Sequence, residues 1–172
     1  ILKNLNLSMK TINSFISEKL KITKNMLNNQ YEYVDLGLPS GTLWAKCNVG
    51  AKTETEYGDY FAWGETKSKK EYSWESYEFG SKNNLKKYND KDKLTNIKIT
   101  DDVAHVIMGS DWSMPTKEQF KELIDNTTNE WIEDYNDTGI NGRLFTSKHN
   151  DNTLFLPVAG VIKNTSNDNV SV

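Results

Sequence analysis

Aromatic side chains are concentrated in one part of this chain. Eleven of its 19 aromatic residues fall between positions 31 and 79, whereas residues 1–29 contain only Phe15. Each aromatic ring buries a large apolar area when it packs. A segment this rich in rings is too apolar to stay disordered. It therefore indicates either a packed core with cross-strand ring pairs or a surface on which rings meet a ligand.

Both interpretations stay open at the level of the sequence. Packing against neighbouring strands is the commoner use of such rings. In the alternative interpretation some of the rings face solvent and form a stacking surface for carbohydrate. The candidate ligand-binding residues are then Trp63, Trp74 and Tyr77.

The rest of the composition is polar and excludes several classes of protein. Asn and Lys contribute 20 residues each, Arg143 is the single Arg, and the net charge is −3. This balance disfavours nucleic-acid binding, which depends on positive charge and on the bidentate donors of Arg. No apolar run approaches the roughly 18 residues of a membrane-spanning helix. The single cysteine, Cys47, excludes a disulfide scaffold and is interpreted as a small buried side chain.

Residues 1–29 contain no Gly or Pro and carry an apolar stripe. The stripe consists of Ile12, Phe15, Ile16 and Leu20, whose spacing predicts an amphipathic helix near residues 11–20. A helix of about ten residues is marginal by itself, so we expect the stripe to dock on another surface. That surface belongs either to the same chain or to a partner protein.

The remainder of the chain predicts a mixture of strands and helices. Strands are expected at 31–36 and 42–47, joined by a turn at Pro39, and a third, aromatic strand at 57–63. A long surface loop is expected over 80–100. Three further antiparallel strands, separated by turn signals, are expected at 130–135, 143–148 and 153–158.

Two helices are predicted between the long loop and the last strands. Thr100 is the expected N-cap of a short helix, with Asp101 and Asp102 in its first turn. A second helix is expected over 116–126, because Thr116 and Gln119 have the spacing of a capping box. Its expected buried stripe consists of Phe120, Leu123 and Ile124.

Searches for the residue patterns of catalysis and metal binding give negative results. His105 and His149 lie 44 positions apart without nearby ligand partners, which disfavours structural zinc. The string that begins at Asp134 starts like a calcium loop but has Phe145 where a bidentate Glu is required. No catalytic residue, metal or cofactor is expected.

Four strings carry a resemblance to a known family. The strings are YVDLGLPSGTLWAKCNVGA (33–51), EYGDYFAWGE (56–65), WSMPTKEQFKEL (112–123) and FLPVAG (155–160). In order and spacing they closely resemble the Fibrobacter succinogenes major paralogous domain, a branch of the C-type-lectin-like fold related to formylglycine-generating enzymes. The resemblance implies an α+β, C-type-lectin-like domain over 30–172, with two short helices and small twisted antiparallel sheets, used mainly for extracellular binding.

The chain departs from this family in two ways. Ser113 stands where the family usually has Arg, and the closing strands that follow the 155–160 motif are expected to be missing. The catalytic cysteines of the enzyme branch would lie in that missing part, and Cys47 does not replace them. The sugar-binding tripeptides of calcium-dependent lectins are absent as well. The expected role is therefore binding without catalysis.

Residues 9–25 resemble a short leader found on virion proteins of crAss-like phages. The resemblance implies a virion structural, decoration or fibre-associated protein that is docked to other virion proteins through residues 1–29 and is oligomeric in the particle. Its lectin-like domain would bind a host-surface glycan or protein, without nucleic-acid binding or membrane insertion. The alternative expectation is an exported bacterial surface adhesin or lipoprotein with the same kind of domain.

Overall fold

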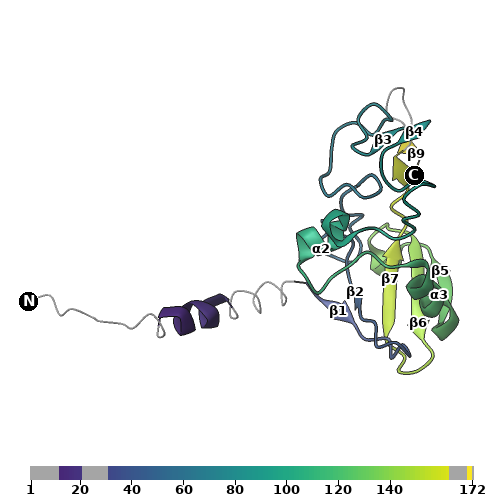
Figure 1. Ribbon diagram of the computed structural model, residues 1–172. Coiled ribbons are helices and arrows are strands. Elements are labelled where there is room, and N and C mark those ends of the chain that lie inside the picture. The colour runs from purple at the N-terminus through teal and green to yellow at the C-terminus, as the bar shows by residue number, and fades with distance from the viewer. Residues whose placement is uncertain (1–11, 21–30, 163–169, 172) are drawn as a thin grey trace, which may run out of the picture. The chain divides into compact units, whose positions relative to one another are not determined.

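The computed structural model describes residues 12–20, 31–162 and 170–171 (Figure 1). The chain divides into two compact units, Ile1–Gln30 and Tyr31–Val172. Within the first unit, residues 12–20 form an α-helix, which confirms the prediction from the apolar spacing, and the side chains of this helix are exposed. The remainder of the leader-like segment lies outside the described residues.

The second unit combines short helices with small antiparallel sheets, which confirms the α+β expectation. Its described helical segments are α2 (Val103–Met108), α3 (Lys117–Asn126) and 3₁₀ turns at Ile99–Asp101 and Tyr135–Asp137. Three strand pairs form two-stranded antiparallel sheets: β1 (Tyr33–Val34) with β2 (Trp44–Ala45), β3 (Gly80–Ser81) with β4 (Asn84–Leu85), and β8 (Val161–Ile162) with β9 (Val170–Ser171). The largest described sheet has the order β5 (Thr127–Ile132), β6 (Gly142–Ser147), β7 (Thr153–Pro157).

The three-stranded sheet supplies much of the core. The strands predicted at 143–148 and 153–158 are confirmed to within one residue at each end. The strand predicted at 130–135 forms as β5 but begins and ends three residues early, and Tyr135 belongs to a 3₁₀ turn. β5 begins early because Asn126 ends α3 and the buried hydroxyl of Thr127 donates to the carbonyl of Leu123 at 2.7 Å, so no loop separates helix from strand. One buried cluster joins the sheet to α3 and to the β1–β2 hairpin: Val34, Leu36, Leu38, Trp44, Leu123, Phe145 and Leu154.

Helix α3 begins where the sequence predicts, but fewer of its residues are buried than the predicted apolar stripe contains. The Thr116 hydroxyl accepts from the Gln119 amide, and the Gln119 side chain accepts from the Thr116 amide, which is the predicted capping box. Leu123 is fully buried, whereas Phe120 is 40% exposed and Ile124 is 52% exposed. The prediction that Phe120 and Ile124 are buried was therefore wrong, although the exposed Phe120 ring still packs edge-on against Trp44 at 5.2 Å.

The cap of α2 also differs from the prediction. Asp102, not Thr100, is the N-cap, and its carboxylate accepts from the His105 amide at 3.0 Å. The same carboxylate accepts from the Met114 amide, with the nearer oxygen at 2.9 Å. Asp102 therefore fixes two segments at once, whereas Thr100 lies within the preceding 3₁₀ turn.

The aromatic strand predicted at 57–63 does not form. Gly58 and Gly64 adopt left-handed φ angles of 76° and 77°, which interrupt an extended strand. The backbone of this segment bonds to a neighbouring turn instead: the Asn48 side chain donates to the Tyr57 carbonyl, and the Asp59 amide donates to the Val49 carbonyl.

Side-chain hydrogen bonds and one small hairpin organise the predicted surface loop over 80–100. β3 and β4 pair at its beginning, and Asp92 accepts from the amides of Tyr88, Asn89 and Leu94 further along. In Figure 1 this loop-rich region lies beyond one end of the three-stranded sheet, on the side from which β7 leads into β8.

Candidate binding site

The three aromatic residues singled out from the sequence line one open hollow. Its volume is about 660 Å³, and its walls come from three segments: residues 60–63, residues 69–94 and residues 160–162. Trp63 is 55% exposed and Trp74 is 41% exposed, while Tyr77 is partly buried. The structure therefore brings these residues together and leaves two large indole surfaces open to solvent.

A chain of ring contacts holds these side chains in place. Trp74 meets Tyr77 edge-to-face at 5.9 Å, Tyr77 meets Phe79 at 5.8 Å, Phe79 meets Tyr88 at 5.8 Å, and Tyr88 meets Trp63 at 6.2 Å. The Tyr77 hydroxyl also donates to the Trp63 carbonyl at 2.9 Å. Edge-to-face pairs of this kind add stability beyond the area that they bury. The two exposed indoles are thus connected through a continuous series of edge-to-face ring contacts.

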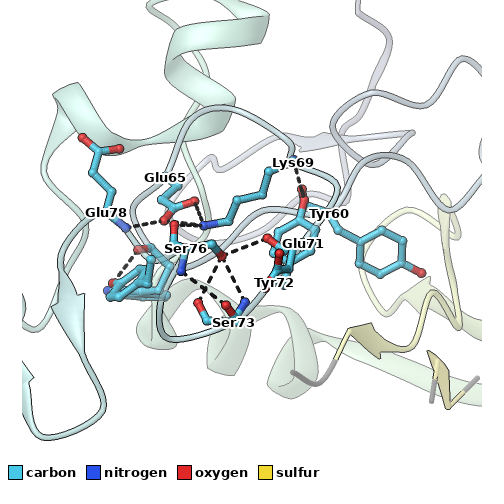
Figure 2. A network of polar contacts seen from close by, with 10 residues as sticks. Tyr60, Glu65, Lys69, Glu71, Tyr72, Ser73, Ser76 and Glu78 are labelled. Carbon is cyan, nitrogen blue, oxygen red and sulfur yellow. Dashed lines mark hydrogen bonds and ion pairs between the residues drawn. The ribbon is translucent and has the colours of Figure 1, made fainter. Parts of the chain in front are cut away.

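The carboxylate of Glu65 is buried and binds both Lys69 and Glu78, at the two ends of a loop (Figure 2). This loop contains Trp74 and Tyr77. Glu65 is 6% exposed and accepts from the Lys69 ammonium at 2.8 Å and from the Glu78 amide at 2.8 Å. Lys69 also donates to the Ser76 carbonyl at 2.7 Å. The Glu65–Lys69 ion pair therefore connects the beginning of the loop to its end at Ser76 and Glu78.

Two serines close the same loop internally. The Ser73 amide donates to the Ser76 hydroxyl at 3.1 Å, and the Ser76 amide donates to the Ser73 hydroxyl at 3.3 Å. The Ser76 hydroxyl donates in turn to the Glu71 carbonyl at 2.9 Å. These bonds satisfy backbone groups that have no strand or helix partner, so the loop has a defined shape without regular secondary structure.

Two tyrosines connect the three walls of the hollow. The Lys69 amide donates to the Tyr72 hydroxyl at 3.1 Å, and that hydroxyl donates to the Tyr60 carbonyl. The Tyr60 hydroxyl donates to the carbonyl of Ala159, which precedes β8. Hydrogen bonds from tyrosine hydroxyls to backbone carbonyls therefore connect the three walls of the hollow, which come from residues 60–63, 69–77 and 160–162.

A second ion pair supports the hollow from the side of the 80–100 loop. Asp101 accepts from Lys87, from the Tyr88 hydroxyl and from Thr100. Burial opposes ionisation of this carboxylate, but the three hydrogen bonds prevail and hold the pKa of Asp101 below its usual value. The Lys87 ammonium also lies 4.8 Å from the centre of the Phe79 ring, a cation–π contact. Burial raises the pKa of Tyr88 and of Tyr77, so both remain neutral phenols at pH 7.

The chemistry of the hollow is that of a neutral, aromatic surface with polar edges. Among the described residues that line it, Lys69 is the charged one, and Glu65 neutralises it. Cys47 lies outside the lining residues, and burial raises the pKa of its thiol, which keeps it protonated. Across the described residues, no group of three or more His, Cys, Asp or Glu side chains could hold a metal ion.

The four candidate docking residues belong to the first unit. On the helix over 12–20, the exposed fractions are 39% for Ile12, 68% for Phe15, 52% for Ile16 and 64% for Leu20. All four apolar side chains are thus exposed on this helix.

Sequence reasoning missed the residues that shape the hollow. Glu65 and Lys69 carry a weak signal, because they have the i, i+4 spacing of an ion pair, but they lie outside any helix. Tyr60 and Tyr72 belong to the aromatic-rich segment over 31–79, and nothing in their spacing marks them as donors to distant carbonyls.

Comparisons with known proteins give no relatives for this chain. No family model, no curated protein and no solved structure matches it. None of the helices within the described residues has the length and apolar character needed to cross a membrane.

Proposed function

We propose that the hollow binds carbohydrate and that the chain is a binding protein without enzymatic activity. The supporting observation is the pair of exposed indoles, Trp63 and Trp74, on rings fixed by edge-to-face contacts. An aromatic face offers apolar area to the C–H face of a sugar ring at little cost in conformational entropy, because the ring is already immobilised. The phenol hydroxyls at the edges already donate within the protein, and their oxygens can accept from sugar hydroxyls.

The C-type-lectin-like fold implied by the four sequence strings is part of this proposal. Two short helices and small antiparallel sheets are compatible with it. Binding residues lie disproportionately on loops that a rigid scaffold positions, and the hollow is lined mainly by residues 60–94, most of which are outside helices and strands.

We also propose that the chain is a virion structural or decoration protein that attaches a phage to its host surface. Two observations support this role: the resemblance of residues 9–25 to a crAss-like phage leader, and the exposed stripe that includes Phe15 and Ile16. In this proposal residues 1–29 dock on other virion proteins, and the second unit binds the host glycan. The alternative proposal is an exported bacterial surface adhesin or lipoprotein, and a lipoprotein signal upstream of Ile1 in the gene would favour it.

A glycan array probed with the full chain tests the carbohydrate proposal. We expect a restricted set of glycans to bind wild-type protein and to be lost in Trp63→Ala and Trp74→Ala. Tyr33→Ala is the matched control, because Tyr33 is 55% exposed and does not line the hollow. A wild-type chain that binds no glycan, or a Trp63→Ala chain that binds as wild type does, would contradict the proposal.

A further inference from the structure

A second, smaller hollow is lined in part by residues that are close in sequence to those of the first hollow. Its volume is about 250 Å³, and its lining residues are Tyr57, Trp131, Gly139, Asn141 and Val158. Trp131 is 46% exposed and Tyr57 is 37% exposed, so this hollow too presents aromatic surface to solvent.

Trp131 is held in a fixed position on the sheet. It stands opposite Arg143 in the register of β5 and β6, and the guanidinium carbon of Arg143 lies 6.0 Å from the centre of the indole. Arg143 is itself fixed by donation to the Asn129 side chain at 3.1 Å. An immobilised ring loses little entropy when a ligand stacks on it.

Asn141 adds an oriented amide to the second hollow. Its side-chain oxygen accepts from the Asp134 amide at 3.0 Å, and its carbonyl accepts from the Val158 amide at 3.0 Å. The side-chain nitrogen of this exposed residue has no protein partner in the described part of the chain, so its two N–H groups are available to a ligand.

The same two segments line both hollows. Tyr57 belongs to the second hollow and Tyr60 to the first, and three residues span at most about 11 Å. Likewise Val158 lines the second hollow and Gly160 lines the first. Ala159, between them, accepts from the Tyr60 hydroxyl, which fastens the two segments together at this point.

We propose that the two hollows are subsites of one extended site for an oligosaccharide chain, in which Trp131 stacks on a sugar residue beyond those held by Trp63 and Trp74. This inference rests on the proposed carbohydrate binding and specifies its ligand as a chain of several neutral sugar residues. A longer chain that reaches Trp131 gains affinity because the second contact forms within the same complex.

Oligosaccharide ladders from disaccharide to octasaccharide, of the cellulose, mannan and xylan types, test this inference with the full chain. Wild-type affinity should rise with chain length. Trp131→Ala should remove that rise, weakening the longest ligand about tenfold and leaving the shortest unchanged. Trp131→Phe, which keeps an aromatic ring, should retain most of the rise, and Asn141→Ala should reduce it without altering the β5–β6 ring contact.

The outcomes separate this inference from the proposed function. If Trp63→Ala abolishes binding but Trp131→Ala and Asn141→Ala bind every length as wild type does, the extended site is wrong and carbohydrate binding stands. If Trp131→Ala weakens all lengths equally, Trp131 acts on the first hollow and the extended site is again wrong. If wild-type protein binds glycans on the array but no member of any ladder, the extended site is wrong and carbohydrate binding stands. If it binds neither an array glycan nor a ladder, both proposals are overturned.

Discussion

The ammonium of Lys69 donates to the buried carboxylate of Glu65 at 2.8 Å, four residues away, in a segment that is not helical. The pair owes its geometry to the loop closed by Ser73 and Ser76 rather than to a helix. Because Glu65 also accepts from the Glu78 amide, it joins the two ends of the loop that presents Trp74 and Tyr77.

Removal of one partner of this pair should destabilise the second unit. Lys69→Ala leaves a buried carboxylate without its counter-charge, a change that costs roughly 3–5 kcal/mol for a fully buried pair. We expect about 2 kcal/mol, because the Lys69 side chain is 21% exposed. Urea unfolding measures the loss. The control is Lys121→Ala, which breaks an exposed i, i+4 pair with Asp125 and should cost less than about 0.5 kcal/mol. Equal losses in the two variants would contradict this role for Glu65.

Gly64 should tolerate no side chain. Its φ of 77° disfavours other residues, and an added Cβ would lie 2.8 Å from the Tyr88 ring and 3.1 Å from the Phe79 ring. Gly41 is a matched control, because it has a φ of 75° and no atom within 4 Å of an added Cβ. Gly41→Ala should cost about 1 kcal/mol of unfolding free energy from backbone strain alone. Gly64→Ala should cost clearly more and should also change the near-ultraviolet circular dichroism of the displaced rings.

Lowering the pH should reduce the contribution of Asp101 to the free energy of unfolding. Its folded-state pKa is depressed, so its contribution to the unfolding free energy is complete above the unfolded pKa of about 3.9 and is lost as pH falls through the folded value. Asp101→Asn should therefore remove part of the stability at about pH 7 and less of it at about pH 3. Urea unfolding of both proteins at the two pH values measures this difference. A stability loss that is the same at both would exclude the proposed linkage.

The apolar stripe on the first unit should be dispensable for folding and required for docking. Phe15→Asp with Ile16→Asp places two charges on exposed positions, so the thermal unfolding of the second unit should be unchanged. Incorporation of the tagged variant into phage particles during infection, measured by sedimentation, should be lost. Incorporation at the wild-type level would show that this helix is not the docking segment.

The sequence predicts those elements of the fold whose structure depends mainly on residues close together in the chain. The capping box of Thr116 and Gln119 and the three strands of the sheet are of this kind. The strand predicted at 57–63 failed because its aromatic composition resembles that of a strand, whereas Gly58 and Gly64 turn the backbone into the left-handed region. Asp102 replaced Thr100 as a cap because it also binds Met114, twelve residues away, which no local pattern reveals.

In the candidate site, too, some residues are predicted from the sequence, whereas the contacts between residues far apart in the chain are not. The sequence singled out Trp63, Trp74 and Tyr77, and all three line one hollow. The contacts that build its walls connect side chains to backbone carbonyls far along the chain, as from Tyr60 to Ala159. Such contacts have no period, so they cannot be predicted from spacing.

Isothermal titration of the full chain with the strongest glycan from the array tests the central claim most directly. Because the ligand-facing surface is neutral, the affinity of wild-type protein should be nearly the same at about 0.1 M and about 1 M salt, where charge interactions are screened differently. Trp63→Ala and Trp74→Ala should each weaken binding at least about tenfold, while Tyr33→Ala should bind as wild type does. Wild-type affinity in either tryptophan variant would contradict the account.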